Sequence, residues 1–263
     1  MKYIYETHLH TCQSSACGWT KGRDYIPYYQ DMGYAGIIVT DHFFRGNTAV
    51  SRNLPWAERV NQFCLGYEDA RETGEKAGFS VFFGWEENYQ GDEYLIYGLS
   101  KQWLINHPEV ERFTRRQQFE AVRKAGGCVV QAHPFRDKEY LSDIHLSTGC
   151  VDAVEAYNAG NHPDNDILAL RYAKLLGLPV TAGSDMHQIN HRPGELLMGV
   201  VFDQPLASIR DYVKAIREKR PFGVHIPEGR GEWREGIDIR LPVDVRNGQD
   251  ISTGRDVWEL LMP

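Results

Sequence analysis

The stretch Gly36–His42, GIIVTDH, joins an apolar run directly to a polar Thr-Asp-His. A short apolar run of this kind predicts a strand buried on both faces, and the polar triplet then falls at its carboxyl end. In parallel α/β folds, the carboxyl ends of the strands converge on the active site. The stretch therefore predicts an α/β protein whose site is built from residues that follow its strands.

Short apolar runs and longer amphipathic runs alternate along most of the chain. Further strands are predicted at 3–5, 79–83, 94–97, 128–131, 151–156, 180–182 and 197–202. The helices predicted between them are 24–32, one long helix behind Pro55 that carries Trp56, Val60, Phe63, Tyr67 and Ala70 on one face, 117–124, 166–176, and one opened by Pro205. This alternation indicates a parallel sheet with crossover helices, and six or seven such units favour closure into a barrel.

The alternation stops near Pro227. Residues 1–226 are predicted to form the barrel, and residues 227–263 a C-terminal appendage that packs on the barrel or contacts a second copy of the chain in a homo-oligomer. Within the appendage, IDIRLPV (237–243) alternates like an exposed or edge strand. A chain of 263 residues can bury about three quarters of its unfolded surface, so it needs no structural metal to build a core. Any metal ligands are therefore expected to be functional.

The composition excludes several classes of protein. The 29 Lys and Arg against 36 Asp and Glu give a net charge of -7, the wrong sign for holding long nucleic acid by bulk electrostatics. No run approaches the roughly 18 apolar residues of a membrane span, and Glu6 interrupts the amino-terminal segment before a signal-peptide core could form. Five cysteines without CxxC spacing suit a reducing compartment. We expect a cytoplasmic protein with no membrane partner.

Four further motifs follow predicted strands in the way that Thr40-Asp41-His42 does. They are His8-Leu9-His10, Gly84-Trp85-Glu86, Ala132-His133-Pro134 and Gly183-Ser184-Asp185-Met186-His187. Residues two apart on a strand point to the same side, so both imidazoles of the first motif face one way. Taken singly, each motif has an ordinary interpretation, such as an exposed pair, a turn before a proline or a helix cap. Their joint occurrence at strand ends favours a single cluster.

A cluster of imidazoles and carboxylates without thiolate suits Zn, Fe or Mn at a catalytic site better than a structural zinc. The candidate ligands are His8, His10, His42, Glu86, His133, Asp185 and His187. They exceed what one tetrahedral ion needs, and a carboxylate such as Glu86 can bridge two ions. The sequence therefore predicts two or three divalent metal ions as cofactors.

These motifs, in this order, resemble the motif series of the PHP (polymerase and histidinol phosphatase) superfamily over residues 3–222. The chain resembles the stand-alone phosphoesterases of that superfamily, because no polymerase module accompanies it. The resemblance implies a distorted seven-stranded (β/α)7 barrel. It also implies three metal positions, formed by His8, His10, Glu86 and Asp185, by Glu86 and His133, and by His42 and His187.

Two positions depart from the superfamily pattern. Where many relatives carry an Asp or His shortly after His-x-His, this chain has Ser15 and Cys17, and Cys17 either takes that role or is a small buried thiol. Many relatives also carry a His in or just after the strand that follows the Glu, where this chain reads EYLIYGLSKQW (93–103). The candidates for that place are Tyr94, Ser100 and His107.

The cluster and the resemblance together predict a metal-dependent phosphoesterase, a phosphatase or phosphodiesterase acting on a small phosphorylated metabolite or nucleotide. A hydroxide bridging two ions, its pKa lowered by the metals, would attack phosphorus in line. Asp185 or His187 would carry protons. Arg136 is the best candidate to bind the phosphate, because it follows His133 by three residues and presents a planar fork.

Arg45 and Arg192 are weaker candidates for anion contacts, and for both the preferred interpretation is a solvated loop charge. Asn158 either faces the site or closes a turn.

Three other functions stay open. One is histidinol-phosphate hydrolysis; another is amide or ring hydrolysis, which a lysine at a strand end would favour and this chain lacks. The third is a non-catalytic, metal-binding regulatory protein of the PHP type.

Overall fold

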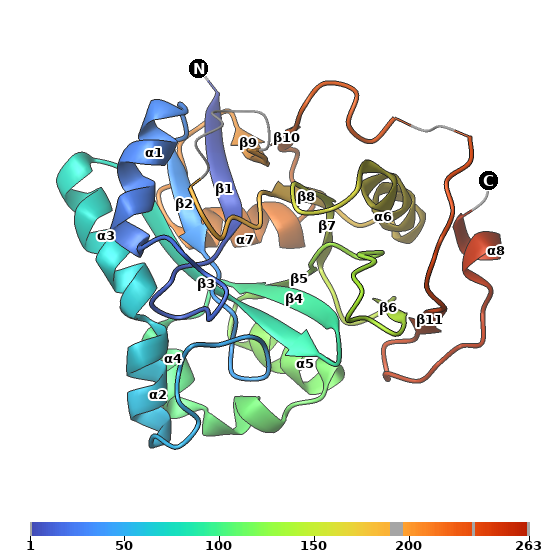
Figure 1. Ribbon diagram of the computed structural model, residues 1–263, viewed down its shortest axis with the longest axis horizontal. Coiled ribbons are helices and arrows are strands. Elements are labelled where there is room, and N and C mark those ends of the chain that lie inside the picture. The colour runs from blue at the N-terminus through green and yellow to red at the C-terminus, as the bar shows by residue number, and fades with distance from the viewer. Residues whose placement is uncertain (1, 190–196, 233–234, 262–263) are drawn as a thin grey trace.

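The computed structural model describes residues 2–189, 197–232 and 235–261, which form a mixed α/β fold around a nearly closed, barrel-shaped sheet (Figure 1). The strands of this sheet are β1 (Tyr3–Leu9), β2 (Gly36–Val39), β3 (Ser80–Tyr89), β4 (Asp92–Tyr97), β5 (Cys128–Gln131), β7 (Ala153–Asn158), β8 (Val180–Gly183), β9 (Gly199–Phe202) and β10 (Gly223–His225). Their order across the sheet is β10-β9-β1-β2-β3-β4-β5-β7-β8. The predicted α/β class and barrel shape are confirmed.

The sheet has nine strands among the described residues rather than seven, and it is not all parallel. Parallel pairs join β1 to β2, β2 to β3, β5 to β7 and β7 to β8, whereas β4 runs antiparallel to both neighbours and β9 runs antiparallel to β1 and β10. The antiparallel strands β3 and β4 are joined by a tight turn through Gln90 and Gly91, both with positive φ. Such a hairpin needs no crossover helix, so counting strand–helix units understates the number of strands.

Helices cover the outside of the barrel, with α1 and α3 over one flank and α6 beside β7 and β8 (Figure 1). They are α1 (Tyr25–Asp31), α2 (Trp56–Phe63), α3 (Leu65–Ala77), α4 (Lys101–Asn106), α5 (Arg115–Lys124), α6 (Pro163–Leu176), α7 (Ile209–Arg217) and α8 (Val257–Leu261), with 3-10 turns at Gly22–Asp24 and Pro108–Arg112. The single long helix predicted behind Pro55 is wrong, because the chain bends at Cys64. Beyond the bend, Gly66 packs so closely on Thr11 that a Cβ would clash with it.

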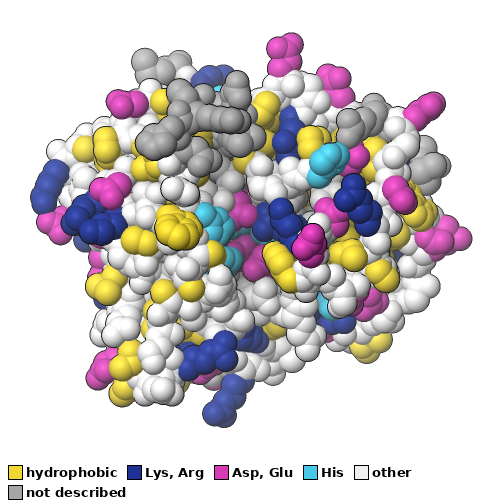
Figure 2. All heavy atoms as spheres, in the orientation of Figure 1, with side chains coloured by type: hydrophobic (Ala, Val, Ile, Leu, Met, Phe, Trp, Pro, Cys, Tyr) yellow, Lys and Arg dark blue, Asp and Glu magenta, His cyan; other side chains and the backbone are white. Residues whose placement is uncertain are grey.

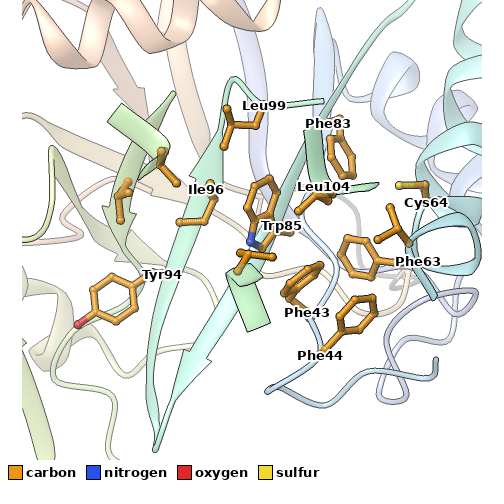
Figure 3. Close-up of a cluster of buried hydrophobic side chains, with 14 of the residues drawn as sticks. Phe43, Phe44, Phe63, Cys64, Phe83, Trp85, Tyr94, Ile96, Leu99 and Leu104 are labelled. Carbon is orange, nitrogen blue, oxygen red and sulfur yellow. The ribbon is translucent and has the colours of Figure 1, made fainter. Parts of the chain in front are cut away.

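An aromatic cluster between the β3–β4 hairpin and helices α2 and α4 fixes the outer face of that hairpin (Figure 3). Trp85 lies at its centre, fully buried, with Phe43 and Phe83 around it. Because side chains alternate along a strand, the arrangement that directs Trp85 outward directs Glu86 to the inner face. The interior below Glu86 is filled by a second cluster that draws side chains from β1, β2, β4, β5, β7 and β9 and is closed by Tyr212 and Ile216 of α7.

The segment after β10 packs against α6 and β6 (Ile144–Ser147). Strand β11 (Val243–Arg246) pairs in parallel with β6, and α8 contacts α6. The alternating stretch predicted as a strand at 237–243 lies almost wholly before β11, which begins at Val243. Arg230 fastens the segment to α6 and to the loop after β7. Its Nε donates to Asp166 Oδ2 of α6 at 2.7 Å, and its Nη2 donates to the carbonyl oxygens of Asn158 and Asn161.

No helix within the described ranges combines the length and the apolar character needed to cross a membrane.

The pair Arg230–Asp166 generates a prediction about stability. Burial raises the pKa of Asp166 to about 7, against the lowering effect of Arg230. Arg230→Ala leaves this carboxyl buried without its partner, so we expect a loss of about 3–5 kcal/mol of unfolding free energy at pH 8. The loss should shrink toward pH 5, because a carboxyl with a raised pKa is protonated in the folded state there and costs less to bury. Urea denaturation at both pH values measures it.

The matched control is Arg240→Ala, which removes an exposed arginine of the same segment that is only loosely paired, at 3.6 Å, with Asp137. The double variant Arg230→Ala/Asp166→Asn should recover much of the lost stability at pH 8. An equal loss at pH 5 and pH 8 for Arg230→Ala would contradict the assigned role of the Asp166 carboxylate.

Candidate metal centre

The seven predicted ligands converge at the carboxyl ends of five strands. His8 and His10 come from the end of β1, His42 follows β2, Glu86 lies on β3, His133 follows β5, and Asp185 and His187 follow β8. All are buried or nearly so except His187, whose side chain is 30% exposed. Figure 2 shows histidine and acidic side chains at the bottom of a depression near the middle of one face. The convergence predicted from the motifs is therefore present in the fold.

Main-chain hydrogen bonds place the ligands next to one another. Phe43 N donates to Glu86 O and Glu86 N to Asp41 O, which sets His42 alongside Glu86. At the other side, His10 N donates to Met186 O at 2.8 Å, and Met186 N donates to His8 O at 3.2 Å. The residues that flank Met186 are therefore held against the His8–His10 pair.

The donor atoms of these side chains face one another at short range. His8 Nε2 lies 3.1 Å from His10 Nε2 and 3.2 Å from Glu86 Oε1, which is also 3.1 Å from His133 Nε2. Asp185 Oδ1 lies 3.1 Å from His10 Nε2. Two ligands on one ion, each about 2.0–2.2 Å from it at roughly 90–110°, lie about 3–3.5 Å apart. The spacing fits donor atoms that share a metal ion.

Four groups of side chains in the described residues have their donor atoms close enough to hold an ion. They are His8–Glu86–His133, His8–His10–Asp185, His10–His42–His187 and His42–Glu86–Glu93. The groups overlap, because His8, His10, His42 and Glu86 each belong to two of them. Such a chain of groups suits several neighbouring ions with bridging carboxylates better than one isolated ion.

Hydrogen bonds behind the histidines fix which nitrogen faces the centre. His8 Nδ1 lies 3.0 Å from Glu155 Oε1, and a carboxylate only accepts, so Nδ1 carries the proton. His10 Nδ1 lies 3.2 Å from Ser15 Oγ, whose own proton goes to Asp41 Oδ1 at 2.7 Å, so this Nδ1 also donates. Both Nε2 atoms therefore turn toward the centre and toward each other. Histidine ligands of metals are typically oriented in this way by a partner on the far nitrogen.

The charges around the centre favour a cation between these atoms. Burial lowers the pKa of His8, but the carboxylates of Glu155, Asp185 and Glu86 overcome that effect and raise its pKa well above the usual range. Two buried atoms, His42 Nδ1 and Glu86 Oε2, lie 2.8 Å apart without the geometry of a hydrogen bond, and neither is hydrogen-bonded to any other described residue. Lone pairs directed at a common point explain this pair, so the residues fit divalent metal ions.

The backbone is strained at two of the candidate ligands. His133 has φ of 27° and Asp185 has φ of 52°, which are uncommon conformations for residues with a Cβ. Strain of this kind persists only where the surroundings hold it, and it gathers at functional sites. Here it turns the side chains that follow β5 and β8 inward, over the end of the barrel.

Two carboxylates of the centre escaped the sequence analysis. Glu93 on β4 lies with Oε2 3.5 Å from His133 Nε2 and Oε1 3.9 Å from His42 Nδ1. Glu155 on β7 holds His8 and also accepts from Asn158 Nδ2 at 2.9 Å. The predicted strand began at Tyr94, one residue too late to include Glu93. The signal for Glu155 was a charged residue inside an otherwise apolar strand.

The three candidates that the sequence offered for this stretch, Tyr94, Ser100 and His107, lie away from the centre. The hydroxyl of Tyr94 bonds Asp92 and Ser147 on the outer face, Ser100 caps the N-terminus of α4, and His107 stacks on Trp103. Alternation along β4 explains the difference, because Tyr94 points outward when Glu93 points inward.

Cys17 lies beside His187 and His42 and is only partly buried. Burial raises the pKa of its thiol, but hydrogen bonds with His187 and His42 outweigh that effect and lower the pKa to about 6. The thiol therefore adjoins the candidate ligands and is not an isolated core thiol.

Arg136 lies at the centre, as predicted, whereas Arg45 does not. Arg136 Nη2 donates to Asp185 Oδ2 at 2.6 Å and to Asn158 Oδ1 at 3.0 Å, so Asn158 also reaches the site. Arg45 instead pairs with Glu87 and covers the ring of Tyr89. Arg192 falls outside the described residues.

No known protein family matches the chain, and no curated protein sequence matches it. Among solved structures, PsfC from Pseudomonas syringae has a TM-score of 0.52 at 14% identity, covering 88% of this chain and 93% of PsfC. A Bifidobacterium adolescentis protein, provisionally named a metal-dependent phosphoesterase, has a TM-score of 0.51 at 17% identity, covering 81% of this chain and 96% of its own. These likenesses show a shared fold. A Chromobacterium violaceum amidohydrolase structure with bound sulfate has a TM-score of 0.43 at 15% identity, covering 81% of this chain and 96% of its own.

The role of Glu155 generates a prediction about metal affinity. Glu155→Gln keeps the shape of the side chain but removes the charge that orients His8, so metal affinity should fall about 10- to 100-fold. Titration of metal-free protein with Mn²⁺ or Zn²⁺ measures it. Glu120→Gln, an exposed glutamate of α5, is the control. Unchanged affinity in Glu155→Gln would show that His8 binds no metal or needs no such partner.

Proposed function

We propose that this chain is a metal-dependent phosphoesterase of the PHP superfamily, acting on a small phosphorylated molecule. One observation carries the proposal: an arginine fork, Arg136, is hydrogen-bonded to a carboxylate, Asp185, that also faces the histidine cluster. Arginine presents the paired donors that suit a phosphate, and clustered divalent ions favour phosphoester hydrolysis. The fold shared with a protein named for that activity agrees with the proposal.

Four side chains, His8, His10, Glu86 and Asp185, would hold the first ion, with Glu86 and His133 extending to a second. Glu93 with His42 and Glu86, and His187 with His10 and His42, offer further places. Bound there, divalent ions would polarise the phosphoryl oxygens and lower the pKa of water to make a nucleophile near neutral pH. Their charge would also offset the net charge of -7 that otherwise repels a phosphate.

The contacts of Arg136 keep its guanidinium pointing across the end of the barrel. Nη2 is shared between Asp185 Oδ2 and Asn158 Oδ1, and Nε donates to Asn161 Oδ1 at 3.0 Å. This brace fixes the guanidinium before substrate arrives and leaves its Nη1 group to donate to a phosphate, so little conformational entropy is lost on binding. The proposed task of Arg136 is to bind and orient the phosphate.

Of the two residues considered for proton transfer, His187 is the better placed. Both oxygens of Asp185 are engaged, Oδ1 with the histidines and Oδ2 with Arg136. His187 Nδ1 donates to Asp185 O at 2.8 Å, so Nε2 is the nitrogen that would exchange a proton with the leaving group, in an enzyme in which His187 itself binds no ion. Its partial exposure at the edge of the centre makes this exchange accessible to substrate.

The competing functions make different demands on the same residues. Ring or amide hydrolysis through a carbamylated lysine is disfavoured, because Glu86 lies between His8 and His133 where a bridging lysine would be needed. The lysine nearest in sequence to a candidate ligand, Lys138, is exposed and donates to Gly160 O. A regulatory protein without catalysis would bind metal but show no turnover. Histidinol phosphate and nucleotides remain candidate substrates within the proposed class.

The test is hydrolysis of p-nitrophenyl phosphate alongside elemental analysis. The wild-type protein should carry two or three ions and lose activity on chelation, regained with Mn²⁺ or Zn²⁺. His10→Ala should lose metal and at least about 100-fold of the activity, since it removes a ligand shared by two groups. His162→Ala, an exposed histidine before α6, is the control. Metal binding without any turnover would leave the regulatory function, and metal-free wild-type protein would overturn the proposal.

A second variant tests the phosphate contact. Arg136→Lys keeps the positive charge beside Asp185 but loses the planar fork, so kcat/KM for phosphate monoesters should fall about 10- to 100-fold with metal content retained. Arg45→Lys, which alters an arginine away from the centre, should leave kcat/KM unchanged. If Arg136→Lys turns over substrate as the wild type does, Arg136 has no part in recognising phosphate.

A further inference from the structure

Two large aromatic side chains are exposed on the described surface, and both belong to loops that border the metal centre. Trp19 is 76% exposed and Tyr140 is 75% exposed. The other large hydrophobic residues that are exposed, Leu65, Leu175 and Ile251, are aliphatic. Figure 2 shows hydrophobic side chains on either side of the depression that holds the histidines. Aromatic rings exposed beside a site are candidates for contact with a ligand.

Backbone hydrogen bonds hold the loop that carries Trp19 in place, although the indole ring itself is exposed. Trp19 N donates to His187 O at 2.8 Å, Gly18 N donates to Ser15 O at 3.0 Å, and Cys12 N donates to Thr20 O at 2.9 Å. A Cβ on Gly18 would lie 2.6 Å from the carbonyl carbon of Thr11, so the chain passes too closely there for any other residue. The indole is therefore held next to His187 by its backbone and not by packing of its ring.

Tyr140 approaches the centre from the loop between β5 and β6, which also carries Arg136. Leu141, the next residue after Tyr140, lines a pocket together with Glu93, His133 and Arg136. Leu141 N donates to Lys138 O at 2.9 Å and closes a turn at the end of the loop. The two exposed rings thus adjoin different parts of one centre, the His187 side and the Arg136 side.

We propose that Trp19 and Tyr140 form a subsite for a planar aromatic ring, so that the substrate is a phosphoester whose leaving group carries such a ring, as a nucleotide does. The inference rests on the proposed function, because it places the phosphate at Arg136 and the metal ligands. Stacking on an exposed, pre-positioned ring removes apolar surface from water on both sides and tolerates any base, since every base has a flat face. A sugar phosphate without a base would gain none of this contact.

The matched substrates are adenosine 5′-monophosphate and ribose 5-phosphate, which share the same primary alkoxide leaving group and differ by the base. In the metal-loaded wild type, kcat/KM should be higher for the nucleotide. Trp19→Ala should lower it about 5- to 100-fold for the nucleotide, with Tyr140→Ala acting in the same direction, and neither should change it for ribose 5-phosphate. Trp19→Phe should restore most of the loss, and Leu175→Ala, an exposed aliphatic residue, should change neither substrate.

Adenosine and ribose as inhibitors of p-nitrophenyl phosphate hydrolysis give a second readout. Adenosine should inhibit competitively and do so less well in Trp19→Ala, whereas ribose should not inhibit. Comparing adenosine 5′-monophosphate, cytidine 5′-monophosphate and histidinol phosphate then identifies which ring the subsite takes. Equal kcat/KM for nucleotide and ribose 5-phosphate, with both unaffected by Trp19→Ala, would overturn the subsite while leaving the phosphoesterase intact. No hydrolysis of any phosphoester by the metal-loaded wild type would overturn the proposed function itself.

Discussion

The hydrogen bonds that close the end of β8 onto the end of β1 are the constraint on which the candidate site depends. Met186 is bonded on both sides, to His8 O and from His10 N, so the backbone of one motif interlocks with that of the other. Asp185 and His187 flank Met186 and are thereby set against His8 and His10, although about 175 residues separate the two motifs along the chain. Glu6 also links these two strand ends, because its buried Oε1 accepts hydrogen bonds from both His8 N and Ser184 N.

Joining the end of β8 to the end of β1 brings together charged groups whose burial costs free energy. Several carboxylates and imidazoles are buried together at this end of the barrel, and each loses the hydration it would have in water. The aromatic cluster on the other face of the β3–β4 hairpin holds them in place, since Trp85 and Tyr94 cannot leave it without exposing large apolar surfaces. The packing of the hairpin therefore offsets the electrostatic cost of placing Glu86 and Glu93 inside, and a bound cation would reduce that cost further.

The sequence predicts the seven motif residues well because each lies in or just after the last part of an apolar strand, and the direction of the strand fixes which end of the barrel these residues reach. It predicts Glu93 and Glu155 poorly, because Glu93 lies near the start of the antiparallel β4 and Glu155 in the middle of β7. At those places no polar motif marks the end of a strand, and only the register decides which face a side chain takes. The predicted strand began at Tyr94, two residues after β4 begins, and so left out Glu93. The antiparallel strands were also underestimated, since a hairpin leaves no helix in the sequence to mark it. The close approach of Gly66 to Thr11, just beyond the bend at Cys64, joins residues that are remote in sequence and leaves no mark in the local pattern.

The exposure of the residues around the centre also bears on the size of its substrate. His8 and His10 are fully buried, His187 is 30% exposed, and Trp19 beside it is 76% exposed, so accessibility rises steadily from the deepest ligands outward. A terminal phosphate can reach the deep ligands, whereas a phosphodiester in the interior of a polymer would have to bring two chain segments past the rim. An acidic protein offers such segments no compensating attraction. Depth and charge together therefore favour a small substrate whose phosphate lies at one end and whose remaining part rests on the rim.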